Sequence, residues 1–440
     1  MNNRETFEIK SDLLNGDIVL PSLSPRISKL DNGIDVYAFE NKDMEVIKLE
    51  FFFRNAGTIY QNKIYSSIIT NNQISEGSSK HKSFEIANAI DFHGAFIEKT
   101  VDKETSSINF YFLKKYQDNL LPWFEEIIKD AIFPEYELNI YIQKLKQQYL
   151  VNQMKTDYLS RIKFNEMIFG ENHPFGVIGI LDDYDKLSRE DLIAFYHKFY
   201  NSNECSIIVA GDINGELLSL INKYFGKNDW QRDNKDNQTN FDLKPIIFDS
   251  IKPSSKLINL EQAVQASIRI GKTTISSKHD DFMGLNVLNC LLGGYFGSRL
   301  MSNIREDKGY TYGIGSALYS YKDIGMFYVT ADVKADKCQN AIDEVYKEID
   351  SFSKELVQID ELNAVKNFMI GSTLRSLDGS LEISDRFRPL LKYGFDYDYY
   401  QKYINTIKTI DSETIINLAK NYLSKDSMSE IRVGNETIIQ

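Results

Sequence analysis

Residues 291–314 read LLGGYFGSRLMSNIREDKGYTYGI. Three glycines lie in the first half of this stretch: Gly293, Gly294 and Gly297. They do not form a phosphate-binding loop, because the Lys-Ser/Thr pair and the strand–loop–helix order of such a loop are absent. Glycine instead permits a tight turn and close backbone approach at the end of a helix. The stretch also carries two hydrogen-bond donors, Arg305 and Tyr312.

The regions around this stretch have the periodicities of an α+β protein. Residues 46–54 alternate apolar and mostly polar side chains, with Ile47, Leu49, Phe51 and Phe53 on one face, which predicts a half-buried strand. Residues 120–129 and 136–151 have the pattern of amphipathic helices, separated by Phe133-Pro134.

A helix followed by a strand is predicted twice, at 188–197 and 205–212, and again at 411–422 and 429–435. A shift of 223 residues (431 − 208) lays Ile208 on Ile431. At nearly the same shift, Glu137-Leu138-Asn139 recurs as Glu361-Leu362-Asn363. We therefore expect a duplicated unit of about 200 residues. The predicted fold class is α+β, with two homologous domains, each a mainly antiparallel sheet packed with helices.

The predicted domains are residues 1–226 and residues 243–440, joined by a linker at residues 227–242. Most of that linker, KNDWQRDNKDNQTN, is polar and almost free of aliphatic side chains, as expected of a solvated connection. The length of 440 residues, with 42% hydrophobic and 26% charged residues, suits a globular protein with two or more cores.

The charge and the cysteines exclude several classes of protein. A net charge of −12 disfavours nonspecific binding to nucleic acid or to anionic membranes; solubility explains it, and a basic ligand is the alternative. Cys205, Cys290 and Cys338 are isolated, so we expect buried, reduced thiols. No segment approaches the roughly 20 apolar residues of a membrane span, and the start has no apolar signal region, which predicts a cytoplasmic location.

Residues 291–314 closely resemble the C-terminal signature of the pitrilysin, or insulinase, family of zinc peptidases. The resemblance runs from about Ile27 to Val433 and includes residues 133–135 and 173–176. Mitochondrial processing peptidase subunits and their bacterial counterparts share this size and two-domain layout. The resemblance implies a processing-peptidase-like (LuxS/metallopeptidase) fold, arranged as half of a clamshell.

Active members of that family carry His-x-x-Glu-His on a helix, so that two His bind zinc beside a Glu that activates water. Residues 76–87 resemble the segment after that motif and fix its register. The first His position is then Ile68, the Glu position is Asn71, and the second His position is Asn72. The third ligand, a Glu on a later helix, aligns with Gln148. Ile has no donor atom, and neutral amides suit harder ions than zinc.

An alignment error of one residue would not restore the motif, because residues 64–74 contain no His, Asp, Glu or Cys. The five His of the chain, at 81, 93, 173, 197 and 279, have neither HxxEH nor HExxH spacing. We therefore expect no metal site and no cofactor in this chain, which is not a zinc peptidase by itself.

Arg305 and Tyr312 match the Arg/Tyr pair that the family uses, from its C-terminal domain, to contact substrate near the scissile carbonyl. Guanidinium and phenol donors can hold a peptide carbonyl and favour the oxyanion that develops there. The alternative for this pair is purely structural, with Arg305 in a salt bridge and Tyr312 packed in a core.

This combination resembles the noncatalytic subunit of a heterodimeric family peptidase. The expected partner is a family subunit that carries HxxEH and zinc, and the expected substrates are unfolded peptides bound in extended form, partly by strand addition. No nucleic acid or membrane partner is expected. One alternative is a scaffold or peptide-binding protein without a role in hydrolysis. Another is a hydrolase that uses Ser298 or Ser302, although neither has an evident His partner.

Overall fold

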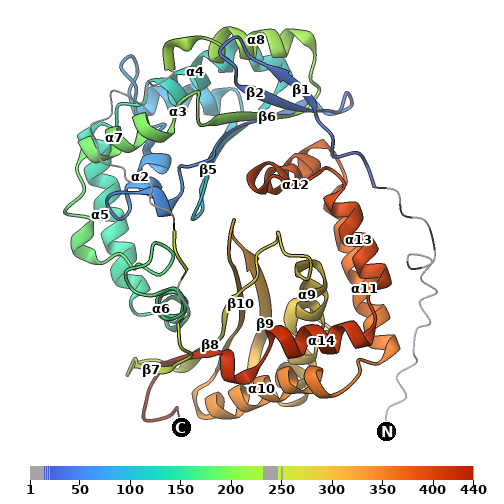
Figure 1. Ribbon diagram of the computed structural model, residues 1–440. Coiled ribbons are helices and arrows are strands. Elements are labelled where there is room, and N and C mark those ends of the chain that lie inside the picture. Colours follow the sequence, from blue (N-terminus) through green and yellow to red (C-terminus); the bar gives the residue numbers. More distant parts are fainter. Residues whose placement is uncertain are drawn as a thin grey trace. The chain divides into compact units, whose positions relative to one another are not determined.

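The computed structural model describes residues 20–230, 246–248 and 251–439, together with Leu14, Gly16 and Ile18. Residues 231–242 of the predicted linker lie outside this described part. The chain forms two compact units (Figure 1). The N-terminal unit comprises Ser24–Ile251 and Gly379–Lys392, and the C-terminal unit is built mainly from Lys252–Asp378 and Tyr393–Gln440.

The N-terminal unit is built on a six-stranded sheet with the order β1-β2-β6-β3-β5-β4. Only the β2–β6 pair is parallel. The strands are β1 (Arg26–Lys29), β2 (Asp35–Glu40), β3 (Val46–Phe53), β4 (Phe96–Val101), β5 (Ser106–Leu113) and β6 (Cys205–Gly211).

The helices of this unit are α2 (Ser66–Gln73), α3 (Ser83–Phe92), α4 (Gln117–Lys129), α5 (Glu135–Asn152), α6 (Thr156–Phe169), α7 (Arg189–Phe199) and α8 (Gly215–Phe225). Several of them pack against one face of the sheet and form its core with it. Figure 1 shows α4 and α8 on this face. Phe110 of β5 stacks on Phe124 of α4 with ring centroids 4.0 Å apart, and Phe51 of β3 lies 4.6 Å from Phe225 of α8. The predicted apolar face of β3 is therefore the core face.

The C-terminal unit contains a five-stranded sheet with the order β7-β11-β8-β10-β9. Its strands are β7 (Ser255–Asn259), β8 (Gln265–Thr274), β9 (Thr311–Ser320), β10 (Gly325–Lys334) and β11 (Ser429–Gly434). Its α-helices are α9 (Phe282–Asn289), α10 (Cys338–Lys354), α11 (Ile359–Arg375), α13 (Tyr399–Thr409) and α14 (Ser412–Tyr422), and two π-helical segments, η5 (Cys290–Gly294) and η6 (Met301–Asp307), follow α9. Helices α10 and α14 cover one face of the sheet (Figure 1).

Five strands of the N-terminal sheet repeat the topology of the C-terminal sheet. The order β2-β6-β3-β5-β4 in one unit matches β7-β11-β8-β10-β9 in the other, and the first pair of each is parallel. Helices α7 and α14 keep the offset of 223 residues at both ends (412 − 189 and 422 − 199). Ser188 and Asp411 cap them, each accepting a backbone N–H three residues on. The prediction of two similar α+β domains with mainly antiparallel sheets is confirmed.

Helix α12 (Ser380–Tyr393) lies late in the sequence but packs on the N-terminal sheet, on the face opposite α4 and α8 (Figure 1). Phe387 contacts Tyr37 and Phe39 of β2, with ring centroids 4.9 and 5.2 Å apart. Gly379 and Gly394 flank the helix with φ of +109° and +72°, values that other L-residues rarely adopt. The sequence predicted two domains divided at a single linker and did not predict that residues 379–392 join the N-terminal unit. The linker itself stays a prediction.

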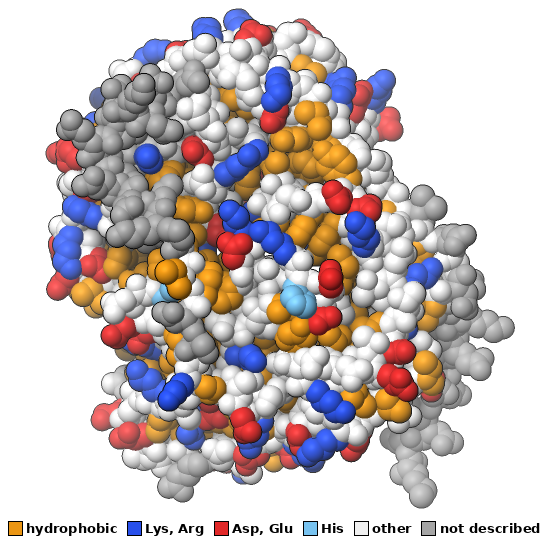
Figure 2. Space-filling view, in the orientation of Figure 1, with side chains coloured by type: hydrophobic (Ala, Val, Ile, Leu, Met, Phe, Trp, Pro, Cys, Tyr) orange, Lys and Arg blue, Asp and Glu red, His pale blue; other side chains and the backbone are white. Residues whose placement is uncertain are grey.

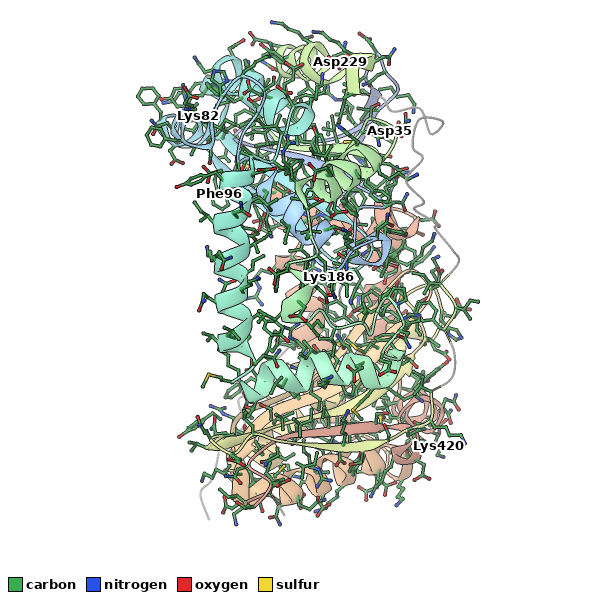
Figure 3. All side chains as sticks on the ribbon, turned by 90° about the vertical axis from the view of Figure 1, so that its left-hand side faces the viewer. Asp35, Lys82, Phe96, Lys186, Asp229 and Lys420 are labelled. Carbon is green, nitrogen blue, oxygen red and sulfur yellow. The ribbon has the colours of Figure 1, made fainter. Side chains whose placement is uncertain are left out.

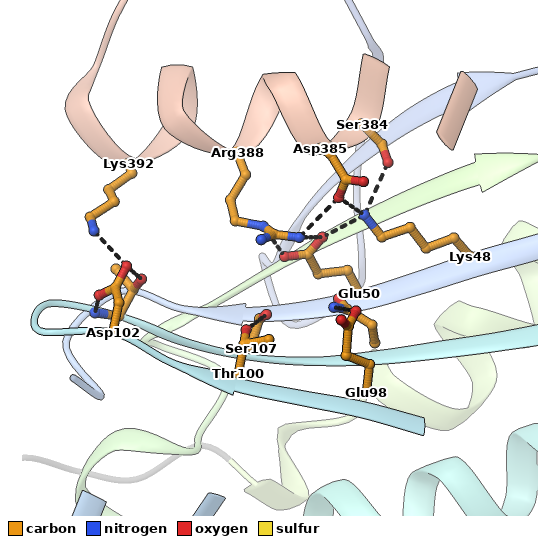
Figure 4. Close-up of polar contacts among 12 residues, drawn as sticks. Lys48, Glu50, Glu98, Thr100, Asp102, Ser107, Ser384, Asp385, Arg388 and Lys392 are labelled. Carbon is orange, nitrogen blue, oxygen red and sulfur yellow. Dashed lines mark hydrogen bonds and ion pairs between the residues drawn. The ribbon is translucent and has the colours of Figure 1, made fainter. Parts of the chain in front are cut away.

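Charged side chains attach α12 to the sheet (Figure 4). Lys48 and Glu50 of β3 are fully buried and lie 3.1 Å apart. The Lys48 ammonium is 2.6 Å from the Asp385 carboxylate, and the Arg388 guanidinium is 2.7 Å from the Glu50 carboxylate. At the end of the helix, Lys392 forms ion pairs with Asp102 and Glu104. Lys48 and Glu50 therefore pair with each other, and α12 supplies a further counterion to each of them.

Two further expectations concern the cysteines and membrane spans. Cys205, Cys290 and Cys338 are free and buried, as predicted. Burial raises the pKa of the Cys290 and Cys338 thiols to about 12, because it disfavours the thiolate. Among the described residues, no helix is both long and apolar enough to cross a membrane.

We predict that Arg388→Ala lowers the free energy of unfolding by about 3 kcal/mol, because Glu50 stays buried after losing a close counterion. Urea unfolding followed by circular dichroism measures this. Adding Glu50→Gln to Arg388→Ala should recover part of the loss, since it removes the buried charge. Lys354→Ala, which removes an exposed ion pair with Asp350, should change stability by less than about 0.5 kcal/mol. Equal effects of Arg388→Ala and Lys354→Ala would contradict the role of α12.

Candidate functional site

The positions of the family's zinc motif lie on α2, and the central one is part of the packed interior. Asn71 is fully buried. Its side-chain amide donates to the backbone carbonyl of Thr100 on β4 at 3.1 Å, and its carbonyl accepts the Tyr200 hydroxyl at 2.9 Å. Both ends of the amide are therefore engaged in hydrogen bonds inside the fold. The position predicted to match the catalytic Glu of active relatives therefore holds a structural amide.

Asn72, at the second His position, is half-buried beside a lysine. Its backbone carbonyl accepts from the Lys99 ammonium at 2.6 Å, and Lys99 also donates to Ser75 at 2.9 Å. Burial lowers the pKa of Lys99, and the nearby Glu76 carboxylate partly opposes that shift. Burial raises the pKa of Tyr141, although its hydrogen bond with Asn72 acts in the opposite direction.

These residues do not fit a zinc ion. Ile68, at the first His position, is half-buried and has no donor atom. Gln148 lies on α5 and is exposed, and both polar atoms of Asn71 already have partners. A cationic amine on Lys99 next to Asn72 would also repel a divalent cation. Within the described residues, no group of three or more His, Cys, Asp or Glu could hold a metal.

The second set of predicted residues lines a cavity in the C-terminal unit. Its volume is about 540 Å³, and it lies where β8 begins, β9 begins and β10 ends, next to the π-helical segment η6. The lining residues are Gln265, Phe296, Arg305, Glu306, Gly309, Tyr310, Thr311, Tyr312 and Lys334. The structure thus brings Arg305 and Tyr312 to one cavity.

The glycine-rich segment supports this region by close packing. A Cβ on Gly293 would lie 2.5 Å from the backbone nitrogen of Ser316 on β9, which is too close for any side chain. This is the close backbone approach expected from the sequence. It fixes η5 against the edge strand β9, whose first residues carry Tyr312.

The surroundings of Arg305 differ from those of Arg299, six residues earlier in the same motif. Arg299 forms two hydrogen bonds with the Glu361 carboxylate, at 2.7 and 2.9 Å, and stacks on Phe352. Arg305 forms no ion pair with any residue in the described part of the chain, and its guanidinium lies 4.8 Å from the centre of the Phe296 ring. Tyr312 is 89% exposed. Among the described residues, Arg305 is therefore not in a salt bridge, and Tyr312 is not packed in a core. Substrate contact by this pair stays a prediction.

The serines of the motif are poorly placed for nucleophilic chemistry. Ser298 is 1% exposed, and its hydroxyl has no hydrogen-bond partner among the described residues. His279 is the only histidine in the C-terminal unit; it accepts the Asp281 backbone N–H and packs against Tyr422. Among the described residues, no hydrogen bond joins Ser298 or Ser302 to a histidine, so the activated nucleophile of a serine hydrolase is not seen there.

The sequence did not indicate several residues that surround α2 or line the Arg305 cavity. Phe296 lies inside the quoted stretch, three residues before Arg299, and could have been considered as a wall for Arg305. Lys334 and Gln265 come from other strands, and only the strand pairing brings them to the cavity. Lys99, Tyr141 and Tyr200 had no sequence signal linking them to α2.

The geometry defines a class: a protein with a duplicated α+β fold, in which apolar and amide side chains occupy the predicted metal positions on α2. Residues 186–369 match the family model described as the peptidase M16 inactive domain. The solved structure of a peptidase M16 inactive domain from Pseudomonas fluorescens has a TM-score of 0.81 at 19% identity, covering 93% of this chain and 98% of that one.

Two relatives carry different names. The Bacillus subtilis protein named uncharacterized zinc protease YmxG is 24% identical over 362 residues, or 80% of this chain and 84% of that protein. The Helicobacter pylori protein named non-peptidase homolog YmxG is 22% identical over 408 residues, or 90% of this chain and 91% of that protein. These similarities confirm the resemblance to the peptidase M16 family. Residues 186–369 match the model of the inactive domain of these peptidases, and Ile68, Asn71 and Asn72 stand at the predicted positions of the zinc motif.

We predict that Asn71→Asp lowers the free energy of unfolding by about 2 kcal/mol, because a buried carboxylate would face the Thr100 carbonyl without a donor between them. Tyr200→Phe should cost about 1 kcal/mol by removing the other hydrogen bond. Urea unfolding measures both changes. Gln148→Glu is the matched control, since the same kind of exchange at an exposed position should cost less than about 0.5 kcal/mol. If Asn71→Asp lowered the free energy of unfolding no more than Gln148→Glu does, the structural role of Asn71 would be contradicted.

Proposed function

We propose that this chain is the noncatalytic subunit of a heterodimeric zinc metallopeptidase. One contrast within the chain carries this proposal. The amide at the predicted Glu position is buried and hydrogen-bonded at both ends, whereas Arg305 and Tyr312 line an accessible cavity where, among the described residues, neither side chain forms an ion pair. A protein that had only kept a scaffold role would have no need for an unpaired guanidinium at a cavity.

The missing half of the site would come from a family subunit that carries HxxEH. That subunit would supply zinc, the water-activating Glu and the attack on the peptide bond. This chain would supply Arg305 and Tyr312, whose N–H and O–H groups can donate to the carbonyl oxygen as it becomes negatively charged. Neither group can cleave a peptide alone, because neither generates a nucleophile.

Peptide substrates would bind in extended form, partly as an added strand. Each sheet ends in an edge strand that pairs on one side only: β4 in the N-terminal unit and β9 in the C-terminal unit. Phe96 of β4 is 61% exposed and projects outward (Figure 3), and Tyr312 is the second residue of β9. Exposed aromatic side chains beside free edge-strand groups are suited to an apolar peptide strand.

We predict that the purified chain does not retain zinc. After incubation with a zinc salt and dialysis, metal analysis should find far less than one zinc per chain, because the motif positions offer only amides and an aliphatic side chain. Retention of stoichiometric zinc would overturn the noncatalytic assignment and favour a hydrolase that uses other residues.

We predict that the chain restores peptide hydrolysis by an HxxEH-bearing family subunit and that the restored activity depends on Arg305 and Tyr312. Arg305→Ala should lower kcat/KM about 100-fold, as loss of an oxyanion donor does. Tyr312→Phe should lower it about tenfold, since a neutral phenol makes a weaker hydrogen bond. Fluorogenic peptide cleavage by the mixed subunits measures both changes.

The control for this assay is Arg375→Ala, an exposed arginine of the same unit that does not line the cavity. It should leave kcat/KM unchanged. Full activity in Arg305→Ala and Tyr312→Phe would refute the role assigned to the pair. Affinity capture that recovers only subunits without HxxEH would favour the alternative of a structural scaffold.

A further inference from the structure

The Arg305 cavity carries more positive than negative charge. Arg305 and Lys334 both line it, and Glu306 is the one carboxylate among its lining residues. Within the described chain, neither Arg305 nor Lys334 forms an ion pair. Lys308, the residue directly after η6, differs from them because it pairs with Glu344 at 3.1 Å. The cavity thus holds two cations that have no ion-pair partner among the residues that the structure describes.

This local charge runs against that of the whole protein. The net charge is −12, and on the face drawn in Figure 2 the Lys and Arg side chains are interspersed with Asp and Glu. Long-range attraction of anions is therefore unfavourable, and an anion must be held by close contacts. Unpaired cations at a cavity in an acidic protein indicate a site that recognises a specific anionic group rather than a general anion-binding surface.

Phe296 orients the guanidinium for such a group. The Arg305 guanidinium lies 4.8 Å from the centre of this ring, and Phe296 is 63% exposed. An arginine stacked on an aromatic ring keeps the N–H groups at its edge free, and their fork matches the two oxygens of a carboxylate. The Tyr312 hydroxyl can add a neutral donor at the same cavity.

The size of the cavity and its position fit the end of a peptide chain. A volume of about 540 Å³ is within the range of small-molecule sites and can hold a terminal residue. The cavity includes Thr311 and Tyr312, the first two residues of the edge strand β9. A peptide strand added along β9 would therefore meet the two cations at one end of that strand.

We propose that this cavity binds the carboxylate of a peptide, and that in the peptidase complex it holds the carboxylate newly formed at the cleaved bond. This rests on the proposed function for the origin of the peptide. Hydrolysis of a peptide bond adds water, turning the carbonyl carbon into a carboxylate and releasing an amine. The positive charge that favours the oxyanion during the reaction also attracts the carboxylate product. Release of the product must therefore overcome its attraction to Arg305 and Lys334.

Binding to the isolated chain tests this without the partner. A short peptide of alanine, serine and leucine, labelled at its N-terminus, is prepared as the C-terminal acid and as the amide, each with an internal Glu or Gln. In fluorescence anisotropy, the Gln acid should bind at least about tenfold more tightly than the Gln amide, as expected of a hydrogen bond to a charged group. A Glu amide that binds as tightly as the Gln acid would identify a side-chain carboxylate as a second source of the same group.

The variants separate the cavity from general electrostatics. Arg305→Ala should abolish the preference for the acid, Arg305→Lys should recover part of it, and Lys334→Ala should reduce it. Lys337→Ala is the matched control, because Lys337 lies three residues further on, outside the cavity, and should leave the preference unchanged. Equal affinity for all four peptides, or an acid preference that survives in Arg305→Ala, would overturn the proposal. Neither result depends on whether a partner peptidase is activated.

Discussion

The burial of Lys48 and Glu50 on β3 is the constraint from which the architecture of the N-terminal unit follows. Two ionised groups inside a protein are tolerated only when close counterions and hydrogen bonds replace their water. The other strands of the sheet do not supply these groups. Asp385, Arg388 and Ser384 do so from α12, more than 330 residues later in the chain (385 − 48 = 337). The chain must therefore return to the N-terminal sheet before it completes the C-terminal unit.

The two units share a topology but use it differently. In each unit, the segments of functional interest lie between the second and third strands in sequence of the shared five. They are α2 in one unit and α9 with η5 and η6 in the other. In the first unit, hydrogen bonds of Asn71 and Lys99 tie α2, the predicted position of the metal motif, to strand β4. In the second, π-helical geometry at η6 and the stacked Phe296 leave Arg305 available. π-helical turns are frequent at functional sites, which agrees with this difference.

Much of the fold could be predicted from the sequence because periodicity reports burial locally. The alternation of Ile47, Leu49, Phe51 and Phe53 indicated β3, and the offset of 223 residues indicated the duplication. The same alternation left Lys48 and Glu50 on the other face, where a solvated surface was the simplest interpretation. Their burial depends on a contact with α12 that no local pattern encodes. The partners of Asn71 were hidden for the same reason, since Thr100 and Tyr200 reach it only through tertiary packing. The family motif gave Arg305 and Tyr312, but the charge of their cavity depends on Lys334, which strand pairing brings there.

The central claim is that this chain contributes Arg305 and Tyr312 to a site whose metal belongs to another subunit. An experimental structure of the chain with an HxxEH-bearing family subunit and an uncleavable peptide tests it most directly. The account predicts a peptide carbonyl oxygen within about 3.2 Å of both the Arg305 guanidinium and the Tyr312 hydroxyl, with the partner's zinc bound to the same carbonyl region. A peptide held by the partner alone, or an Arg305 closed in a salt bridge with the partner's surface, would contradict it.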